Sequence, residues 1–547
     1  MVEIKSRDLE ADRATLRTVH AAAHGGNHVE AAVLAEAALA DGLEHPLLYN
    51  LAALKLEQLG RVSEAEPLLT RAVEMAPDDL SSRNALGLCL QRLDRPAEAL
   101  KQFEALLKLN SSLPYAHASH GNALFALGAV ADAEASYRRA LAIDANHGVA
   151  LAGLAHIAGS RGAYAAARRW AEKALAVLPG YPPAVMSLTV AELGERKTRE
   201  AEERIRALLA DARLEPGERA HAHGLLGDIL DAQGRPAEAF AAYTACNQEL
   251  QRIHADRFAV RPSAFEYARA MTRHFEGARA EVWKSRPPAA ADQSGVRGHV
   301  FVLGFPRSGT TLLEVILEGH PNVVSLEENE LLIDAVQEFM RRPEDLERLS
   351  RAAPATLEHF RAAYWRLVSA AGVDAAGKTF IDKHPLNTLK LPLIARLFPD
   401  AKILFACRDP RDIVLSCFRH RFRMSAPIYE LLSLEGAARY YDAVMQLLIR
   451  LAAALSLDLC LVRHEDVVTE FEREMKRICT FLGLDWAPAM GDFALRAMTR
   501  GVLTPSTAQL VRGLSTEGIG QWRRYRSQMA DVEGVLDPWV KRFYYDP

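Results

Sequence analysis

The chain has 547 residues, 49% of them hydrophobic and 25% charged, which is the composition of a folded protein rather than a disordered one. Its 66 lysines and arginines nearly balance its 70 aspartates and glutamates. The resulting net charge of −4 argues against a protein that coats nucleic acid or a membrane surface. The 6 cysteines include no C-x-x-C pair, so a zinc ribbon or a dithiol redox site finds no support, and we expect reduced, buried thiols.

The N-terminal segment is charged and lacks the apolar core of a signal peptide, and no uncharged apolar run is long enough to span a membrane. We therefore expect a cytoplasmic protein with no membrane insertion and no nucleic-acid partner. Aromatic residues make up only 7% of the chain and alanine is abundant in the first half, which predicts closely packed helices there.

The first half repeats with a period of 34 residues. Steps of that length from Ala31 reach alanine each time, and a further unit follows after a slip of four, giving Ala31, Ala65, Ala99, Ala133, Ala167, Ala201 and Ala239. Five residues before the first five of these lie turn positions, Gly26, Gly60, Asp94, Gly128 and Gly162. Four residues after the alanine, on the same helix face, lie large residues: Leu69, Phe103, Tyr137, Ile205 and Tyr243.

This pattern resembles the tetratricopeptide repeat over about residues 12–253, in about seven units. The resemblance implies an all-α solenoid whose groove binds a protein or peptide, or which associates with itself. Residues 254–298 are expected to form connecting helices, broken at Pro262, and a proline-containing linker. Residues 299–547 form a second predicted domain.

The second domain opens with a phosphate-binding pattern. Val300 to Leu303 reads as a buried strand, GFPRSGTT follows it, and a helical apolar spacing comes next. Strand, glycine-containing loop and helix N-terminus together suit an anion. The lysine of a nucleoside triphosphatase loop is replaced by Thr310, and Arg307 is the cation of the loop, so the pattern does not favour a kinase.

Pro306, Arg307, Ser308, Gly309, Thr310 and Thr311 resemble the 5′-phosphosulfate loop of sulfotransferases, which use 3′-phosphoadenosine 5′-phosphosulfate (PAPS). A second family signature is a strand, here Lys402 to Cys407, then Arg408, then Ser416 eight residues later. The resemblance implies that Arg408 and Ser416 hold the 3′-phosphate, and that the product is adenosine 3′,5′-bisphosphate. The implied fold is a P-loop-like, three-layer α/β domain with a central parallel sheet.

Residues 298–525 further resemble the tyrosylprotein sulfotransferases. Twenty-one residues after Arg307 lies Glu328, which takes the place of the family's catalytic base. Lys383, at the end of a short strand, takes the place of the lysine that approaches the sulfuryl group, and Ser506, in Ser506-Thr507-x-Gln509, that of a further contact to it.

Elementary chemistry agrees with these assignments. An acceptor hydroxyl must lose its proton as it attacks, and a carboxylate can accept that proton. Charge develops on the leaving oxygen, which Arg307, Lys383 and loop N–H groups can stabilise. No metal is required, and the sequence shows no set of metal ligands.

Four positions depart from the tyrosine-modifying family. His420 stands where an arginine is usual, His464 where a nucleotide-contacting tyrosine is usual, and Gln521 where a lysine is usual. His464 is retained as a candidate donor contact. On the acceptor side Glu330 replaces an arginine, and its charge would repel the acidic flanks typical of tyrosine sulfation sites.

The sequence therefore predicts a PAPS-dependent sulfotransferase acting on a hydroxyl of a protein or peptide recruited by the repeats, with tyrosine among the candidates. Three alternatives stay open: sulfation of a glycan or small molecule with the repeats used for assembly, a P-loop-type kinase, and a non-catalytic repeat scaffold.

Overall fold

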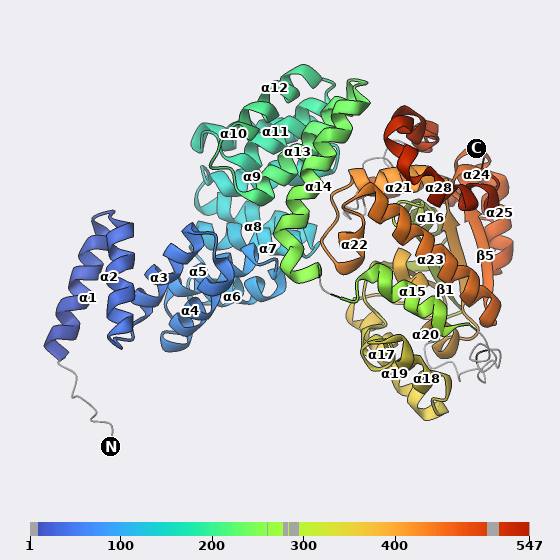
Figure 1. Ribbon diagram of the computed structural model, residues 1–547, viewed down its shortest axis with the longest axis horizontal. Helices are drawn as coiled ribbons and strands as arrows, with labels where there is room; N and C mark the ends of the chain where they lie inside the picture. The colour runs from blue at the N-terminus through green and yellow to red at the C-terminus, as the bar shows by residue number, and fades with distance from the viewer. Residues whose placement is uncertain (1–8, 260, 277–282, 284–294, 500–512, 546–547) are drawn as a thin grey trace. The chain divides into compact units, whose positions relative to one another are not determined.

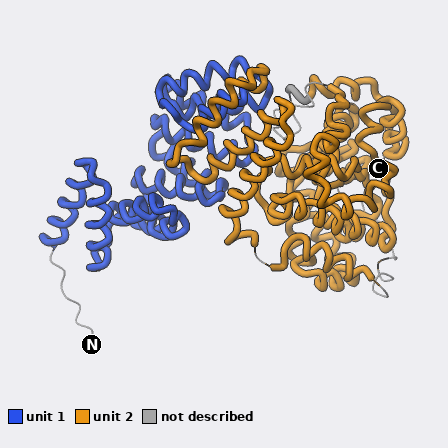
Figure 2. The backbone as a smooth tube through the Cα atoms, turned by 45° about the horizontal axis from the view of Figure 1, so that its top comes forward, with its two compact units in different colours: residues 1–191 blue, residues 192–547 orange. Residues whose placement is uncertain are grey.

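The computed structural model describes residues 9–259, 261–276, 283, 295–499 and 513–545. The chain divides into two compact units, residues 1–191 and residues 192–547 (Figure 2). The division falls within the repeated part of the sequence, so the second unit contains both repeat helices and the sheet domain (Figure 1).

The first unit is built from helix pairs of nearly constant length. They are α1 (Leu9–His24), α2 (His28–Ala40), α3 (Pro46–Gln58), α4 (Val62–Met75), α5 (Leu80–Arg92), α6 (Pro96–Leu109), α7 (Pro114–Ala126), α8 (Val130–Ile143), α9 (Gly148–Ser160) and α10 (Tyr164–Val177), and α11 (Pro182–Gly194) crosses into the second unit.

The repeat positions explain this packing. The alanines that mark the period, from Ala31 to Ala239, are all fully buried, and the large residues four positions later are exposed by at most 2%. At the turn positions the backbone adopts φ values between 56° at Asp94 and 83° at Gly128, a region that glycine enters without strain. The prediction of an all-α repeat array is thus confirmed.

The second unit begins with α12 (Thr198–Leu209), α13 (Pro216–Ala232), α14 (Pro236–Phe258) and α15 (Ala264–His274). Tyr243 of α14 lies against Gly227 of α13, where an added Cβ would come within 2.4 Å of the ring. The pair α13–α14 therefore repeats the close helix contact of the first unit.

The sheet of the second unit has five parallel strands in the order β2-β3-β1-β4-β5. The strands are β1 (Gly298–Gly304), β2 (Val323–Glu327), β3 (Thr379–Lys383), β4 (Lys402–Cys407) and β5 (Asp458–Arg463). All carboxyl ends lie at one edge, because the strands are parallel. Sheets of this kind bind ligands at that edge.

Helices cover both faces of the sheet. On one face α16 (Thr310–Leu317) and α25 (Phe471–Leu482) pack Ile316 and Ile478 against Val302 in the main apolar core. On the other face α19 (Pro354–Ala370) and α23 (Leu434–Ala454) place Tyr364 and Tyr441 against Phe301 and Phe305. The predicted three-layer α/β domain with a central parallel sheet is confirmed.

The remaining α-helices of the described chain are α17 (Ile333–Phe339), α18 (Leu346–Ser350), α20 (Leu391–Leu397), α21 (Pro410–Arg419), α22 (Ala426–Glu430), α24 (His464–Thr469), α26 (Phe493–Thr499) and α28 (Arg526–Arg542), and the 3-10 turn η6 (Gln521–Tyr525) precedes α28. Within the described ranges, none of the helices combines the length and apolarity needed to cross a membrane. All six cysteines are free and buried.

Candidate active site

The loop after β1 is shaped to face an anion. Arg307 and Gly309 adopt φ values of 69° and 101°, which turn the chain so that α16 starts at Thr310. The first N–H groups of a helix have no acceptor within it, and they carry the positive end of its dipole. The Ser308 hydroxyl is fully buried and has no hydrogen-bond partner among the described residues, so it is free to bind a ligand.

The two predicted donor signatures meet in space. Arg307 Nε donates to Ser416 Oγ at 3.0 Å, and Arg408 Nη1 donates to the Arg307 carbonyl at 3.2 Å. Burial and the neighbouring Arg408 lower the pKa of the Arg307 guanidinium to about 10, which leaves it charged near neutral pH. Two clustered guanidinium charges repel each other, and a bound phosphate or sulfate relieves that repulsion.

The position of Ser416 depends on where helix α21 starts, and two residues fix that start. Pro410 occupies the first turn, and Asp409 accepts the Arg411 N–H at 2.9 Å as the N-cap. On the same helix Asp412 accepts the N–H groups of Gly520 at 2.6 Å and Trp522 at 2.9 Å. The helix thus holds the segment around residues 518–522 over its N-terminal half.

That segment also touches the candidate phosphate ligand Arg408, whose Nη2 donates to the Gly518 carbonyl at 2.5 Å. Among the described residues no partner exists for the buried Nε of Arg408. The orientation of the guanidinium is therefore fixed by backbone carbonyls, while one of its donors stays available.

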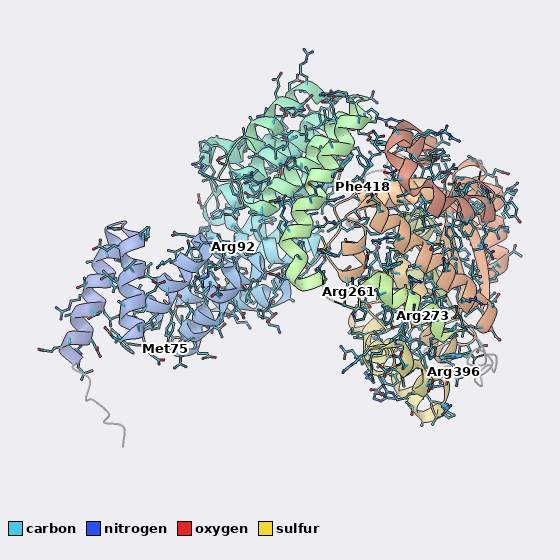
Figure 3. The ribbon with its side chains drawn as sticks, viewed as in Figure 1. Met75, Arg92, Arg261, Arg273, Arg396 and Phe418 are labelled. Atoms are coloured by element: carbon cyan, nitrogen blue, oxygen red, sulfur yellow. The ribbon has the colours of Figure 1, made fainter. Side chains whose placement is uncertain are left out.

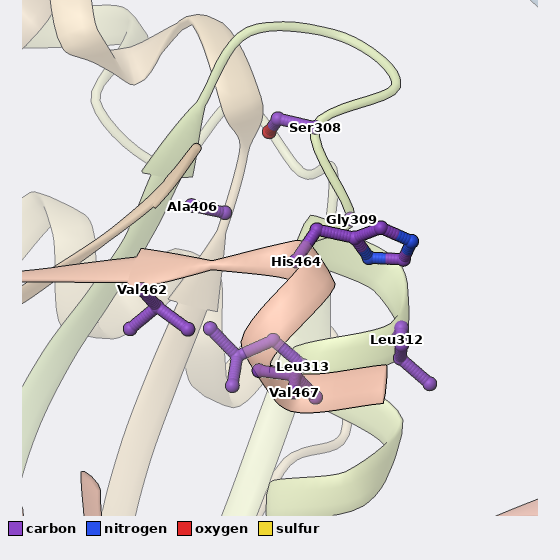
Figure 4. A pocket seen from close by; sticks show the side chains of 8 residues that line it. All are labelled: Ser308, Gly309, Leu312, Leu313, Ala406, Val462, His464 and Val467. Carbon is purple, nitrogen blue, oxygen red and sulfur yellow. The ribbon is translucent and has the colours of Figure 1, made fainter. Parts of the chain in front are cut away.

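His464 closes the other side of the loop (Figure 4). It begins α24 directly after β5 and lines a small pocket with Ser308 and Gly309. A Cβ at Gly309 would come within 2.6 Å of His464 Nδ1, so glycine is required for the imidazole to lie this close. Burial, then Arg408 and Arg307, lower the pKa of His464 to about 3, which keeps the imidazole neutral.

Lys383, at the end of β3, is surrounded by carboxylates. Its Nζ lies 2.7 Å from Glu327 Oε1, 2.8 Å from Glu328 Oε1 and 3.6 Å from Glu314 Oε2. Burial alone would lower the pKa of this ammonium, but the three carboxylates together raise it. Lys383 is thus a permanent cation and cannot serve as a base.

Glu328 combines a fixed backbone with an accessible side chain. Its φ is 49° and its N–H donates to the Lys383 carbonyl at 2.8 Å, which fixes the backbone at the end of the β2–β3 pairing. Its side chain is 49% exposed, whereas those of Glu327 and Glu314 are 9% and 0% exposed. Of the three carboxylates on Lys383, Glu328 is the one that an acceptor can best reach.

Glu330 lies in a small mixed-charge group beside Glu328. Lys390 Nζ lies 2.5 Å from Glu330 Oε2, and His384 Nε2 lies 3.2 Å from Glu330 Oε1. The hydrogen bond from His384, opposed by burial and supported by Lys390, lowers the pKa of Glu330 to about 2. Glu330 stays ionised, with its charge partly offset by Lys390.

The structure therefore brings Arg307, Ser308, Arg408, Ser416 and His464 together around one loop. It places Glu328 and Lys383 together at the end of neighbouring strands. Pro306, Gly309, Thr310 and Thr311 lie in the loop and the first turn of α16, as the sequence predicted. Ser506, with Thr507 and Gln509, lies outside the described residues.

Sequence reasoning missed several residues of the site. Glu314 is the third carboxylate on Lys383, and a charged residue inside the otherwise apolar helix TTLLEVIL was a signal for it. Asp412, which anchors residues 520–522, had no such signal, because it looks like an ordinary acidic residue of a first helical turn. In the described ranges no group of three or more His, Cys, Asp or Glu side chains is arranged to hold a metal.

Comparisons with known proteins match both parts of the chain. Residues 299–488 match a family model described as "Sulfotransferase family", and residues 50–114, 84–148 and 190–246 match one described as "Tetratricopeptide repeat". A tetratricopeptide repeat protein from Parabacteroides merdae is 18% identical, with a TM-score of 0.35, over 44% of this chain and 93% of that chain.

Protein-tyrosine sulfotransferases are among the relatives of this chain. Protein-tyrosine sulfotransferase A of Caenorhabditis elegans is 24% identical over 264 residues, 45% of this chain and 67% of that protein. Protein-tyrosine sulfotransferase 1 of Danio rerio is 25% identical over 267 residues, 45% of this chain and 72% of that protein. An uncharacterized protein of Aquifex aeolicus is 25% identical over 270 residues, 47% of this chain, which span only 35% of its own length.

Proposed function

We propose that this chain, which joins tetratricopeptide repeats to a sulfotransferase-family domain, transfers a sulfuryl group from PAPS to an acceptor hydroxyl. The observation that carries the proposal is the hydrogen bond of 3.0 Å from Arg307 to Ser416. It joins a loop suited to the 5′-phosphosulfate to the helix suited to the 3′-phosphate. One donor molecule with both groups would therefore fit this edge of the sheet.

The residues around the loop fit such a donor. Within the described part of the chain, the buried Ser308 hydroxyl and the buried Arg408 Nε have no hydrogen-bond partner, and the first turn of α16 offers N–H groups. The neutral His464 beside Gly309 can donate or accept a hydrogen bond without adding charge. When bound, PAPS supplies an activated sulfuryl group whose leaving group is a phosphate oxygen.

The chain's own residues divide the remaining chemistry. We assign to Glu328 the acceptance of the proton from the acceptor hydroxyl as its oxygen bonds to sulfur and the bond between sulfur and the leaving oxygen breaks. Lys383 and Arg307 remain protonated and can stabilise the negative charge that develops on the leaving oxygen. In the structure Lys383 also holds the Glu328 carboxylate at 2.8 Å, which orients the base.

For the acceptor we propose a protein or peptide recruited by the repeats, because repeat arrays provide extended binding surfaces. Tyrosine is one candidate, since two of the relatives are protein-tyrosine sulfotransferases. Glu330 keeps its charge next to Glu328, so we expect neutral or basic residues around the modified hydroxyl rather than acidic ones. Self-association through the repeats is the competing use of the array.

Transfer of radiolabelled sulfate from PAPS into a cell extract, followed by identification of the labelled species, tests the proposal. We expect labelled protein with the unmodified chain and a loss of about 100-fold or more for Glu328→Gln. Glu338→Gln is the matched control, because Glu338 has a similarly exposed side chain (47%) and also forms an ion pair, with Arg348.

A chain that neither transfers sulfate nor binds adenosine 3′,5′-bisphosphate would overturn the proposal. Labelling of a glycan or small molecule instead would support sulfuryl transfer and contradict the proposed protein acceptor. Magnesium-dependent phosphate transfer from ATP would support the kinase alternative, and full cellular function of Glu328→Gln would support the scaffold alternative.

A further inference from the structure

The last repeat pair, α13–α14, contacts the C-terminal end of α21, the helix that carries Ser416, within the second unit. Asn247 Nδ2 donates to the Phe418 carbonyl at 2.9 Å in a buried position, and the rings of Phe240 and Phe418 stack with centroids 4.8 Å apart. Figure 3 labels Phe418 at this end of α21. The last carbonyls of a helix lack partners within it, so Asn247 acts as a C-terminal cap supplied by a repeat.

Asp231, at the C-terminal end of α13, connects three parts of the unit. Its Oδ2 accepts from Arg419 Nη2 at 2.6 Å, and its Oδ1 accepts from the Tyr525 hydroxyl at 2.6 Å. Its carbonyl accepts from Arg524 Nη2 at 2.8 Å. The carboxylate is only 12% exposed, so these charge-assisted bonds are poorly screened by water.

The two arginines beside His420 point to the repeats. Arg421 Nη2 lies 2.9 Å from Asp228 Oδ2, and its side chain lies over Gly224, where an added Cβ would come within 2.4 Å of Nη1. Arg419 lies between the rings of Tyr243 and Tyr525, 5.4 Å from each centroid. These cations are therefore used to dock α21 on α13–α14.

Helix α21 and the segment 518–525 position the residues that we assign to binding of PAPS. Helix α21 presents Ser416 to Arg307, and the segment that leads into Tyr525 holds Arg408 through the Gly518 carbonyl. Gln521 of the same segment accepts from Arg419 at 3.1 Å. Asp231 thus lies where the helix bearing Ser416 and the segment holding Arg408 are joined.

We propose that the repeat pair α13–α14 is a positioning element of the donor site, and that Asp231 is the residue through which it fixes α21 and the segment 518–525 together. Asp231 acts through Arg419 and Tyr525 and does not itself touch the donor. The inference rests on the proposed function, because it assigns the docked helix to the 3′-phosphate.

Titration calorimetry of the full chain with adenosine 3′,5′-bisphosphate tests this inference. We expect Asp231→Asn to raise the Kd about tenfold, since it removes the charge that holds Arg419. The KM for the acceptor should stay within about twofold, because Glu328 and Lys383 belong to a different cluster.

Glu202→Gln is the matched control. Glu202 has a similarly covered carboxylate, 17% exposed, and pairs with Arg206 and Arg235 of the repeats at 2.8 Å. We expect its Kd for the bisphosphate to match that of the unmodified chain, even if its Tm falls as far as that of Asp231→Asn.

Tyr525→Phe is the milder second variant, because it keeps the ring against Arg419 and loses only the hydroxyl on Asp231. It serves where Asp231→Asn does not fold, and we expect a Kd raised about threefold. Asp231→Glu should recover part of the affinity that Asp231→Asn loses.

Equal Kd values for the unmodified chain, Tyr525→Phe and a folded Asp231→Asn would overturn the positioning role and leave the proposed function standing. An equal rise of the Kd in Asp231→Asn and Glu202→Gln would also overturn it, since a general loss of stability would then explain the weaker binding. An unmodified chain that does not bind the bisphosphate would overturn both proposals.

Discussion

Helix pairs α7–α8 and α13–α14 share one internal contact, a tyrosine packed against a glycine and hydrogen-bonded to a polar side chain. They differ in that side chain, which is an amide in the first pair and a carboxylate in the second. In the first pair the Tyr137 hydroxyl donates to Asn122 Oδ1 at 2.7 Å, and the ring lies against Gly121. In the second pair the Tyr243 hydroxyl donates to Asp228 Oδ1 at 3.0 Å, and the ring lies against Gly227.

The difference lies in the second oxygen of Asp228. An amide at this position accepts the hydrogen bond of the tyrosine hydroxyl and adds no charge. The carboxylate accepts the same bond and leaves Oδ2 to pair with Arg421 of the sheet domain. A repeat can therefore change from a unit of an array to a support for the sheet domain while its packing pattern stays intact. Variants of both kinds of repeat test this contrast.

Two truncations should separate the two kinds of repeat. A chain starting at residue 192 keeps the compact second unit, and we expect it to fold and to bind adenosine 3′,5′-bisphosphate. A chain starting at residue 254 loses Asp231, Tyr243 and Asn247 and exposes Phe418, so we expect aggregation or loss of binding. Soluble expression and calorimetry check this, and equal binding by both chains would show that α13–α14 is only a passive end of the array.

Ion pairs in the two units should differ sharply in their contribution to stability. Lys383→Met leaves the buried Glu314 and Glu327 and the half-exposed Glu328 without their shared cation, and we expect a loss of about 3 kcal/mol or more in the free energy of unfolding together with loss of activity. Lys55→Met removes a half-exposed pair with Glu36 in the first unit, and we expect a loss of at most about 1 kcal/mol. Urea unfolding at neutral pH measures both, and similar losses would contradict the buried carboxylate cluster.

Exchanging the two polar residues tests the contrast directly. Asp228→Asn keeps an acceptor for Tyr243 but removes the ion pair with Arg421, so we expect a loss of about 1 kcal/mol and weaker bisphosphate binding. Asn122→Asp keeps the acceptor for Tyr137, and we expect a smaller change in stability and unchanged bisphosphate binding. Thermal unfolding with and without the ligand distinguishes these outcomes, and weaker binding in both variants would contradict a local effect.

The smallest predicted effect concerns pH and His464. Its folded-state pKa is lowered to about 3, so on acidification the unfolded chain takes up a proton first and stability falls as pH decreases. From pH 7 to pH 6 this group should cost about 0.7 kcal/mol. His464→Gln should lose less stability over that interval, and an identical pH slope in urea unfolding would show that the imidazole is not held neutral.

Local patterns in the sequence predicted much of this architecture. The 34-residue period predicted the helix pairs, and the buried alanines and tyrosines follow it position by position. Apolar runs predicted β1 and β4, and the order of PRSGTT, Arg408 and Ser416 predicted which segments would meet. The charge inside an apolar helix marked Glu314 as unusual but did not identify Lys383 as its partner, and Asp412 had no local signal for its contact with residues 520–522.

The amino-acid sequence is enough to identify the helical repeats and the parallel-sheet domain, because periodicity and motif spacing depend on neighbouring residues along one helix or strand. The packing of the last repeat on helix α21 follows from the tertiary structure alone, since Asp231 and Arg419 are separated by 188 positions in the chain. Each looks like an ordinary surface charge until folding brings them together away from water, where an unpaired charge would be costly.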